Sequence, residues 1–147
     1  MQISQKGLNL IKEFEGLRHK PYKCAAGVWT IGYGHTNGVS GNTNDITEAQ
    51  AEQYLRDDLR NFETLVNNKN YVPQNINQNQ FDALVSFAFN LGGGNLKELC
   101  NANYPPGKKT VEHIASEITL YNKVKGKFCQ GLANRREKEK QLFLGLI

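Results

Sequence analysis

The sequence predicts an α+β fold in a single domain spanning residues 1–147. Residues 17–45 combine short runs of β-forming residues with closely spaced glycines, which is typical of short antiparallel strands and tight turns. Residues 47–67 have the apolar periodicity of one long helix, and helical periodicity returns after residue 80. We therefore expect a small β lobe at about 17–45, a linking helix at about 47–67 and a mainly α-helical lobe at about 70–147 that includes the N-terminal helix.

The composition is that of an ordinary globular domain, with 39% hydrophobic and 22% charged residues. The chain contains no apolar run of ~18 residues that could span a membrane, and no signal peptide precedes Ser4. The net charge of +4 suits an anionic partner such as a cell wall or nucleic acid, or simply a solvated basic surface. Cys24, Cys100 and Cys129 cannot all pair and their spacing fits no zinc site, so we expect reduced thiols and no metal or other cofactor.

The N-terminal helix is predicted to begin after Ser4, a good N-cap, and to end at Glu15 before Gly16. The following segment contains short strands, and we place them around 22–23, 28–31 and 33–36. Gly32 and Gly34 in this segment indicate either a bulge or packing contact, or room for a polymer against the backbone.

The later part of the chain is predicted to be helical. Thr47-Glu48-Ala49-Gln50 is a capping box that opens the long helix. A polar linker at 70–79 precedes a helix with apolar positions from Phe81 to Leu91. The remaining expected elements are a short helix near Leu96–Cys100, a turn at Pro105-Pro106-Gly107, a helix capped by Thr110 and a last helix that begins near Gly131.

The candidate catalytic residues are Glu15, Cys24 and Thr30. Glu15 shares the apolar stripe of its helix with Leu8 and Ile11, so its carboxylate either has a buried partner or lies at the edge of a cleft. A carboxylate held partly out of water is suited to act as a general acid. Cys24 and Thr30 follow on the strand segment, and an acid that faces a polar group across a gap is the arrangement that glycosidic bond cleavage needs.

The spacing of these residues resembles the active-site signature of phage-type lysozymes, the endolysins of glycoside hydrolase family 24. In that signature Glu is followed after eight residues by Asp or Cys, and after five more by Thr. Glu15, Cys24 and Thr30 match it, and the segment Gly27–Thr36, GVWTIGYGHT, is similar to the family consensus. FDALVSFAFNLG and the GLxxRRxxE-like segment from Gly131 also resemble the family.

The resemblance implies a lysozyme-like fold and a muramidase that cuts the β-1,4 bond between N-acetylmuramic acid and N-acetylglucosamine in peptidoglycan. Glu15 would protonate the leaving oxygen, Thr30 would hold the attacking water and Cys24 would take the place of the commoner Asp. Family members invert the sugar, so the catalytic groups should lie about 6.5–9.5 Å apart. The sequence leaves open whether Cys24 acts through water or attacks the sugar itself.

The resemblance also implies supporting and substrate-binding residues. We expect His35 to contact Asp58 on the long helix, because a half-buried carboxylate needs a partner. Arg135 is the candidate partner of Glu15, whereas Arg136, Lys138 and Lys140 are expected on a solvated face. The candidate substrate-binding residues are Tyr33, Thr36, Phe89 and Asn90.

As an endolysin, the chain would be a monomer that is made in the host bacterial cytoplasm, released through a holin and active on the wall in the periplasm. Its substrate would be peptidoglycan, with no stable membrane anchoring. Two alternatives keep the fold: a binding module that has lost turnover, and the same enzyme used as a secreted antibacterial effector. A nucleic-acid binder is disfavoured because the basic residues alternate with acidic ones and form no aromatic stacking platform.

Overall fold

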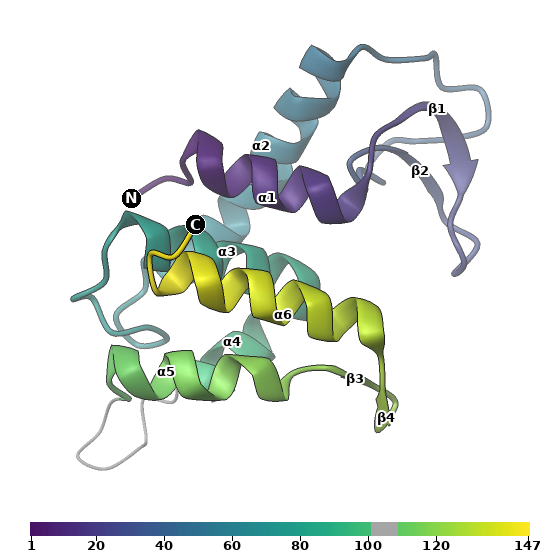
Figure 1. Ribbon diagram of the computed structural model, residues 1–147. Coiled ribbons are helices and arrows are strands. Elements are labelled where there is room, and N and C mark those ends of the chain that lie inside the picture. The colour runs from purple at the N-terminus through teal and green to yellow at the C-terminus, as the bar shows by residue number, and fades with distance from the viewer. Residues whose placement is uncertain (101–108) are drawn as a thin grey trace. The chain divides into compact units, whose positions relative to one another are not determined.

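The structure is a computed structural model that describes residues 1–100 and 109–147 (Figure 1). The turn predicted at Pro105-Pro106-Gly107 lies outside the described residues. The chain forms two compact units. The sheet unit comprises Asn9–Arg60, and the helical unit comprises Met1–Leu8 together with Asn61–Ile147. Both boundaries fall inside helices, α1 (Gln5–Glu15) and α2 (Glu48–Val66).

The mixture of helices and small antiparallel sheets confirms the predicted α+β class. The sheet unit contains β1 (Arg18–Lys23) and β2 (Trp29–Gly32), which pair antiparallel with Tyr22 opposite Thr30. The pairing carries an irregularity between Arg18 and Tyr22.

The third predicted strand, at 33–36, is wrong. The chain turns back after β2 instead, and His35 exchanges two backbone hydrogen bonds of 2.9 Å with Ile31. Gly32 and Gly34 have φ angles of 66° and 87°, which side chains rarely adopt, so the two glycines permit this turn. Gly32 also packs closely against Ala51.

The predicted limits of α1 are confirmed. Ser4 caps the helix by accepting a hydrogen bond from the backbone N–H of Gly7 at 3.2 Å, and Gly16 follows the last turn with φ 72°. Leu8 and Ile11 on its apolar stripe are fully buried. The cap is anchored to α3 (Gln78–Leu91), because the backbone N–H of Ser4 donates to the buried carboxylate of Asp82 at 3.0 Å.

The long helix α2 begins with the predicted capping box, in which Thr47 and Gln50 bond each other's backbone N–H groups at 3.1 and 2.9 Å. The polar linker is shorter than predicted, because Asn77 and Gln80 form a second capping box and α3 starts at Gln78. This Asn-x-x-Gln pattern was a readable signal in the sequence.

The helical unit continues with α4 (Gly93–Cys100), α5 (Val111–Glu117), the 3₁₀ turn η1 (Ile118–Leu120) and α6 (Gln130–Phe143). Helices α3 and α6 lie side by side (Figure 1). The core of the unit consists of fully buried apolar side chains, among them Phe81, Leu84, Phe87, Leu96, Leu99, Ile114 and Leu142.

A second hairpin, which the sequence did not lead us to expect, precedes α6. It consists of β3 (Lys123–Val124) and β4 (Lys127–Phe128). Lys125 and Gly126 between them have φ angles of 49° and 79°, and positive φ at both central residues is the hallmark of the tight hairpin turn that Gly favours. The signal was the Lys-Gly pair between two short β-forming runs.

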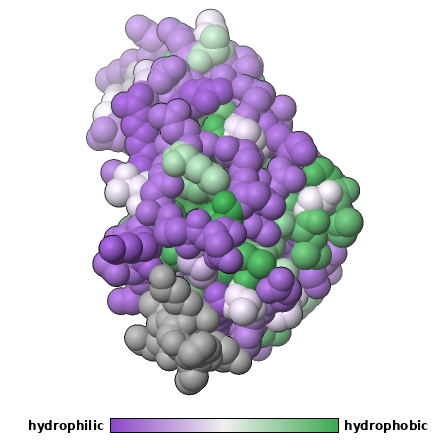
Figure 2. Space-filling view, turned by 90° about the vertical axis from the view of Figure 1, so that its left-hand side faces the viewer, coloured by the Kyte–Doolittle hydropathy of each residue, from purple (hydrophilic) through white to green (hydrophobic). Residues whose placement is uncertain are grey.

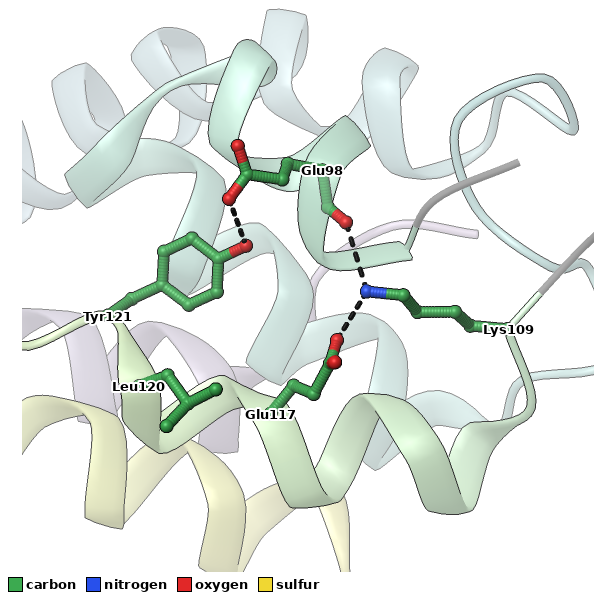
Figure 3. Close-up of a pocket in the computed structure, with 5 residues that line it drawn as sticks. All are labelled: Glu98, Lys109, Glu117, Leu120 and Tyr121. Atoms are coloured by element: carbon green, nitrogen blue, oxygen red, sulfur yellow. Dashed lines mark hydrogen bonds and ion pairs between the residues drawn. The ribbon is translucent and has the colours of Figure 1, made fainter. Parts of the chain in front are cut away.

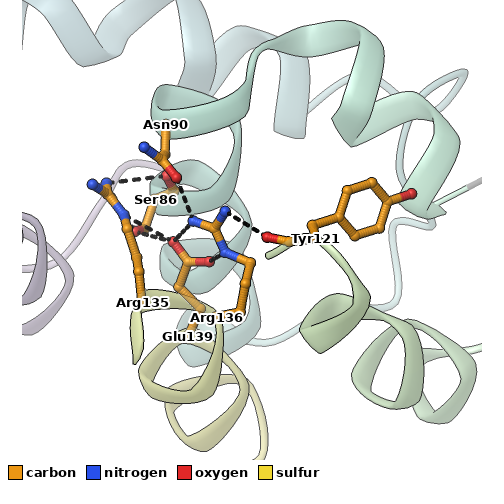
Figure 4. Close-up of polar contacts among 6 residues, drawn as sticks. All are labelled: Ser86, Asn90, Tyr121, Arg135, Arg136 and Glu139. Carbon is orange, nitrogen blue, oxygen red and sulfur yellow. Dashed lines mark hydrogen bonds and ion pairs between the residues drawn. The ribbon is translucent and has the colours of Figure 1, made fainter. Parts of the chain in front are cut away.

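A charged cluster lies buried between α3 and α6 (Figure 4). The carboxylate of Glu139 accepts hydrogen bonds from Arg136 Nε at 2.6 Å and from Ser86 Oγ at 2.6 Å, and it also pairs with Arg135 Nε at 3.4 Å. Arg136 and Glu139 are completely buried and Arg135 is 5% exposed. The prediction of a solvated face was therefore wrong for Arg136, because Glu139 one helical turn later neutralises it.

The face in Figure 2 is mainly hydrophilic, with apolar side chains gathered at its right-hand edge. Within the described residues, no helix combines the length and the apolar character that a membrane span requires.

Candidate active site

Glu15 is the last residue of α1, so its backbone is fixed by the helix while its side chain lies where the chain turns towards β1. The side chain is half-buried. A β-carbon built on Gly34 would lie only 3.3 Å from Oε1 of Glu15. The glycine turn after β2 therefore passes directly beside the carboxylate, and glycine at this position leaves room for it.

Cys24 follows β1 in a turn that two backbone hydrogen bonds close, from Cys24 N–H to the Val28 carbonyl at 3.0 Å and from Gly27 N–H to the Cys24 carbonyl at 2.8 Å. Hydrogen bonding by the backbone N–H groups of Val28 and Ala26 lowers the pKa of the Cys24 thiol, and partial burial opposes this effect. The thiol is partly exposed.

Thr30 lies in β2 and is 4% exposed. Its hydroxyl donates to the Val28 carbonyl at 2.9 Å. The same hydroxyl can instead turn its one proton to the thiolate of Cys24, and this hydrogen bonding further lowers the pKa of that thiol. The structure thus brings Cys24 and Thr30 together at one end of the hairpin, while the turn that leaves the same hairpin passes beside Glu15.

Lys23, the residue before Cys24, is not among the causes of the lowered pKa of the Cys24 thiol. Its ammonium group lies over the ring of Trp29, 5.4 Å from the ring centre. Backbone N–H groups, rather than the neighbouring lysine, dominate the pKa of Cys24. A side chain on a strand points away from its sequence neighbours, and this explains the difference.

Comparisons with known proteins show the family of the chain. The family model described as phage lysozyme matches residues 12–139. The chain belongs to the phage lysozyme family. The endolysin of Bacillus phage PZA is 46% identical over 145 residues, which cover 97% of this chain and 55% of the relative. The chain thus spans little more than half the length of that protein.

Other endolysins match over nearly their whole length. The endolysin of Acyrthosiphon pisum secondary endosymbiont phage 1 is 42% identical, with 97% of this chain and 98% of that protein covered. The solved endolysin of Escherichia coli O157:H7 phage FAHEc1 superposes with a TM-score of 0.81 at 36% identity and covers 100% of this chain and 96% of the other. These matches confirm the lysozyme-like fold.

The predicted contact between His35 and Asp58 is present in the structure of this family member. Nδ1 of His35 lies 2.9 Å from a carboxylate oxygen of Asp58, and both side chains are largely buried. The imidazole also stacks on Tyr54 with ring centres 4.3 Å apart and planes 6° apart. The pair therefore ties the turn after β2 to α2 within the sheet unit.

A double-mutant cycle tests the strength of this tie. We expect His35→Ala and Asp58→Ala to be coupled by about 1–2 kcal/mol in the free energy of unfolding, because each single change leaves the other half-buried polar side chain without its hydrogen-bond partner. The control is a second cycle that combines His35→Ala with Asp57→Ala. Asp57 is exposed on the same helix, so these two changes should show no coupling. Purely additive effects at His35 and Asp58 would show that their contact does not stabilise the fold.

The four candidate substrate-binding residues lie in different settings. Tyr33 is 6% exposed and its hydroxyl donates to Glu48 at 3.3 Å, whereas Thr36 is exposed. In the helical unit, Phe89 packs edge-to-face on Phe62, and the Asn90 side chain accepts a hydrogen bond from Arg136 at 2.8 Å. Their roles in substrate binding stay predictions.

Arg135 has partners in its own unit, with Nη2 donating to the Ser86 carbonyl at 3.4 Å. Its contact with Glu15 stays a prediction, because the two residues belong to different units. Ser86 and Glu139 hold the two arginines in place, and the sequence analysis assigned neither of them a partner. The signal for Glu139 was its spacing of three and four residues from the two arginines.

A pocket of about 260 Å³ lies in the helical unit (Figure 3). Lys109 pairs with Glu117 and donates to the Glu98 carbonyl at 3.2 Å, and the Tyr121 hydroxyl donates to Glu98 at 2.9 Å. Lys109 lowers the pKa of Glu117, while burial raises the pKa of Tyr121. Since these lining groups bond one another, we assign no ligand to this pocket.

Among the described residues, no group of acidic, His and Cys side chains is placed to hold a metal ion.

Proposed function

We propose that this chain is a muramidase that acts as an endolysin, hydrolysing the β-1,4 bond between N-acetylmuramic acid and N-acetylglucosamine in bacterial peptidoglycan. The observation that carries the proposal is the placing of Glu15 beside the glycine turn of the hairpin that holds Cys24 and Thr30. The relatives named endolysin support it, as does the solved muramidase domain of SpmX from Asticaccaulis excentricus, at 36% identity and a TM-score of 0.81.

In the proposed mechanism, Glu15 donates a proton to the glycosidic oxygen while a water attacks the opposite face of the sugar. Cys24, which is more exposed than Thr30, accepts a proton from that water as a thiolate. The lowered pKa of the Cys24 thiol increases the fraction of thiolate near neutral pH. Thr30 orients the water and the thiol through its hydroxyl. Such a water requires a separation of about 6.5–9.5 Å between the catalytic groups and gives an inverted product.

Product analysis tests the function directly. Purified, lipid-free peptidoglycan digested by the protein should gain reducing ends, and borohydride reduction followed by mass spectrometry should place them on muramic acid. New free amino groups without reducing ends would indicate a peptidase or amidase instead and overturn the proposal. The anomer first formed, followed by NMR, should be inverted, whereas retention would mean that Cys24 attacks the sugar itself.

Gly34→Ala should lower wall-clearing activity by about tenfold or more, because the new β-carbon would press on the Glu15 carboxylate and small misplacements are costly in catalysis. Gly38→Ala is the matched control. Gly38 also has a positive φ, 73° against 87°, but its β-carbon would meet nothing within 4 Å. Both changes carry a backbone cost of about 1–2 kcal/mol. Equal activity of the two folded variants would argue against a role for the Gly34–Glu15 contact.

Cys24 should react with maleimide at a lower pH than an ordinary cysteine, because its pKa is lowered. Cys100 should not compete, since burial raises its pKa to about 12. Cys129 is partly exposed, so the rate should be measured in a Cys129→Ser background. Complete labelling of Cys24 should stop lysis, and Cys24→Asp should remain active. Full activity after labelling would remove Cys24 from the site.

The cellular setting that we propose follows from the endolysin function. The protein would be made in the host bacterium and reach the wall after release through a holin. It would act as a monomer on peptidoglycan. Deleting the holin in a lysogenic host should then leave the protein active in extracts but delay lysis of intact cells.

A further inference from the structure

The hairpin β3–β4 exposes an unusual combination of cations and apolar side chains. Lys123, Lys125 and Lys127 are all exposed, while Val124 is 51% and Phe128 62% exposed. The six residues 123–128 carry +3, whereas the whole chain carries a net +4. No acidic residue occurs between Glu117 and Glu137. Three of these six residues are lysines, and no nearby acidic residue in the sequence offsets their charge.

Both faces of the hairpin are open. The register pairs Lys123 with Phe128 and Val124 with Lys127, and paired residues share a face of a two-stranded ribbon. Each face thus presents one lysine beside one apolar side chain. Leu120, just before the hairpin, is 68% exposed and adds to the apolar surface. The ribbon extends beyond the first turn of α6 (Figure 1).

Among the residues that the structure describes, the side chains of the three lysines form no hydrogen bond and no ion pair, so nothing described in the protein neutralises their charge. A two-stranded hairpin is only marginally stable by itself, and apolar side chains that stay exposed to water add no free energy of burial to its stability. The tight turn and the hydrogen bond from Cys129 N–H to the Asn122 carbonyl at 2.8 Å nevertheless hold it in shape.

We propose that this hairpin docks the protein on an anionic phospholipid bilayer. Lysines near such a surface attract its phosphate groups, and Val124, Phe128 and Leu120 can enter the boundary between head groups and acyl chains. A hydrophilic polyanion would attract the lysines but offer nothing to the apolar side chains, so the combination favours lipid. Three lysines alone should strengthen partition by about 100-fold. The binding is peripheral, reversible and weakened by salt.

Vesicle flotation tests the proposal with the full chain. Vesicles of phosphatidylcholine with 30% phosphatidylglycerol should bind the protein at low salt, and pure phosphatidylcholine vesicles should not. The triple variant Lys123→Gln, Lys125→Gln, Lys127→Gln should lose about 100-fold in partition. A control triple variant at the exposed positions Lys20, Lys69 and Lys138 removes the same charge and should lose less than about fivefold.

The apolar contribution has its own test. Phe128→Ser should lower partition by about tenfold. Leu146→Ser, at a 70% exposed position outside the hairpin, should leave partition unchanged. All variants must show the thermal unfolding of the wild type, which separates lost binding from lost folding.

Three results would overturn the proposal. Equal losses in the two triple variants would mean that the net charge, not the hairpin, attracts the vesicles. Wild-type binding by the hairpin variant would mean that another surface binds. Slower hydrolysis of lipid-free peptidoglycan by the hairpin variant, with vesicle binding intact, would make the hairpin a substrate contact. The rate of hydrolysis of lipid-free peptidoglycan also tests the proposed hydrolase function independently of membrane binding, and this rate should be unchanged in every hairpin variant.

Discussion

Glu15→Gln should retain the fold and lose about 10²–10⁴-fold in the rate of peptidoglycan hydrolysis, because an amide has nearly the shape of the carboxyl group but cannot deliver a proton. The backbone of Glu15 is held at the end of α1, and its side chain lies beside Gly34. The substitution therefore changes the chemistry of the group much more than its position. The rate of reducing-end formation from purified peptidoglycan, at equal concentrations of folded protein, measures the effect.

The control is Glu13→Gln, which removes the same charge from an exposed position on the same helix. It should keep nearly full activity and the same thermal unfolding midpoint. If Glu15→Gln remains folded and clears cell walls at a substantial rate, Glu15 is not the proton donor. If both variants lose activity equally, the effect belongs to the charge of α1 rather than to the acid itself.

Glu139→Ala should destabilise the fold by about 3–5 kcal/mol, because it leaves the guanidinium groups of Arg135 and Arg136 buried without a counter-charge. Arg136 and Glu139 are completely buried, and Glu139 accepts from both arginines and from Ser86 (Figure 4). For a chain of this length the change corresponds to a fall of about 10 °C in the unfolding midpoint. Chemical denaturation of both proteins gives the free energy directly.

Glu137→Ala serves as the matched control, since Glu137 is exposed on the same helix. It should cost less than about 0.5 kcal/mol. A second variant separates lost pairing from lost packing: replacing Arg136 by Met and Glu139 by Leu together should recover part of the loss, because Arg136 no longer remains as a buried charge while Arg135 still does. A Glu139→Ala protein as stable as the wild type would show that the cluster does not hold α3 and α6 together.

Much of the local structure was predictable because its causes lie within a few residues of one another. Ser4 and Thr47 start helices by accepting hydrogen bonds from backbone N–H groups three positions ahead, and Gly16 ends α1 in the left-handed conformation. The spacing of Glu15, Cys24 and Thr30 could be recognised for the same reason, since all three occur within one contiguous segment. The sequence by itself therefore determined most of the helices, the caps at Ser4 and Thr47, the family and the candidate catalytic residues.

The tertiary structure decided which residues distant in sequence meet. Residues 33–36 form a turn because Gly32 packs on Ala51 and His35 reaches Asp58 on α2. Arg136 is buried because α3 supplies Asn90 and its own helix supplies Glu139. Neither outcome follows from β-propensity or charge pattern, since both depend on what covers the residue after folding. Local bonds are fixed by neighbours along the chain, whereas burial and charge pairing depend on packing between elements, and only the folded structure specifies that packing.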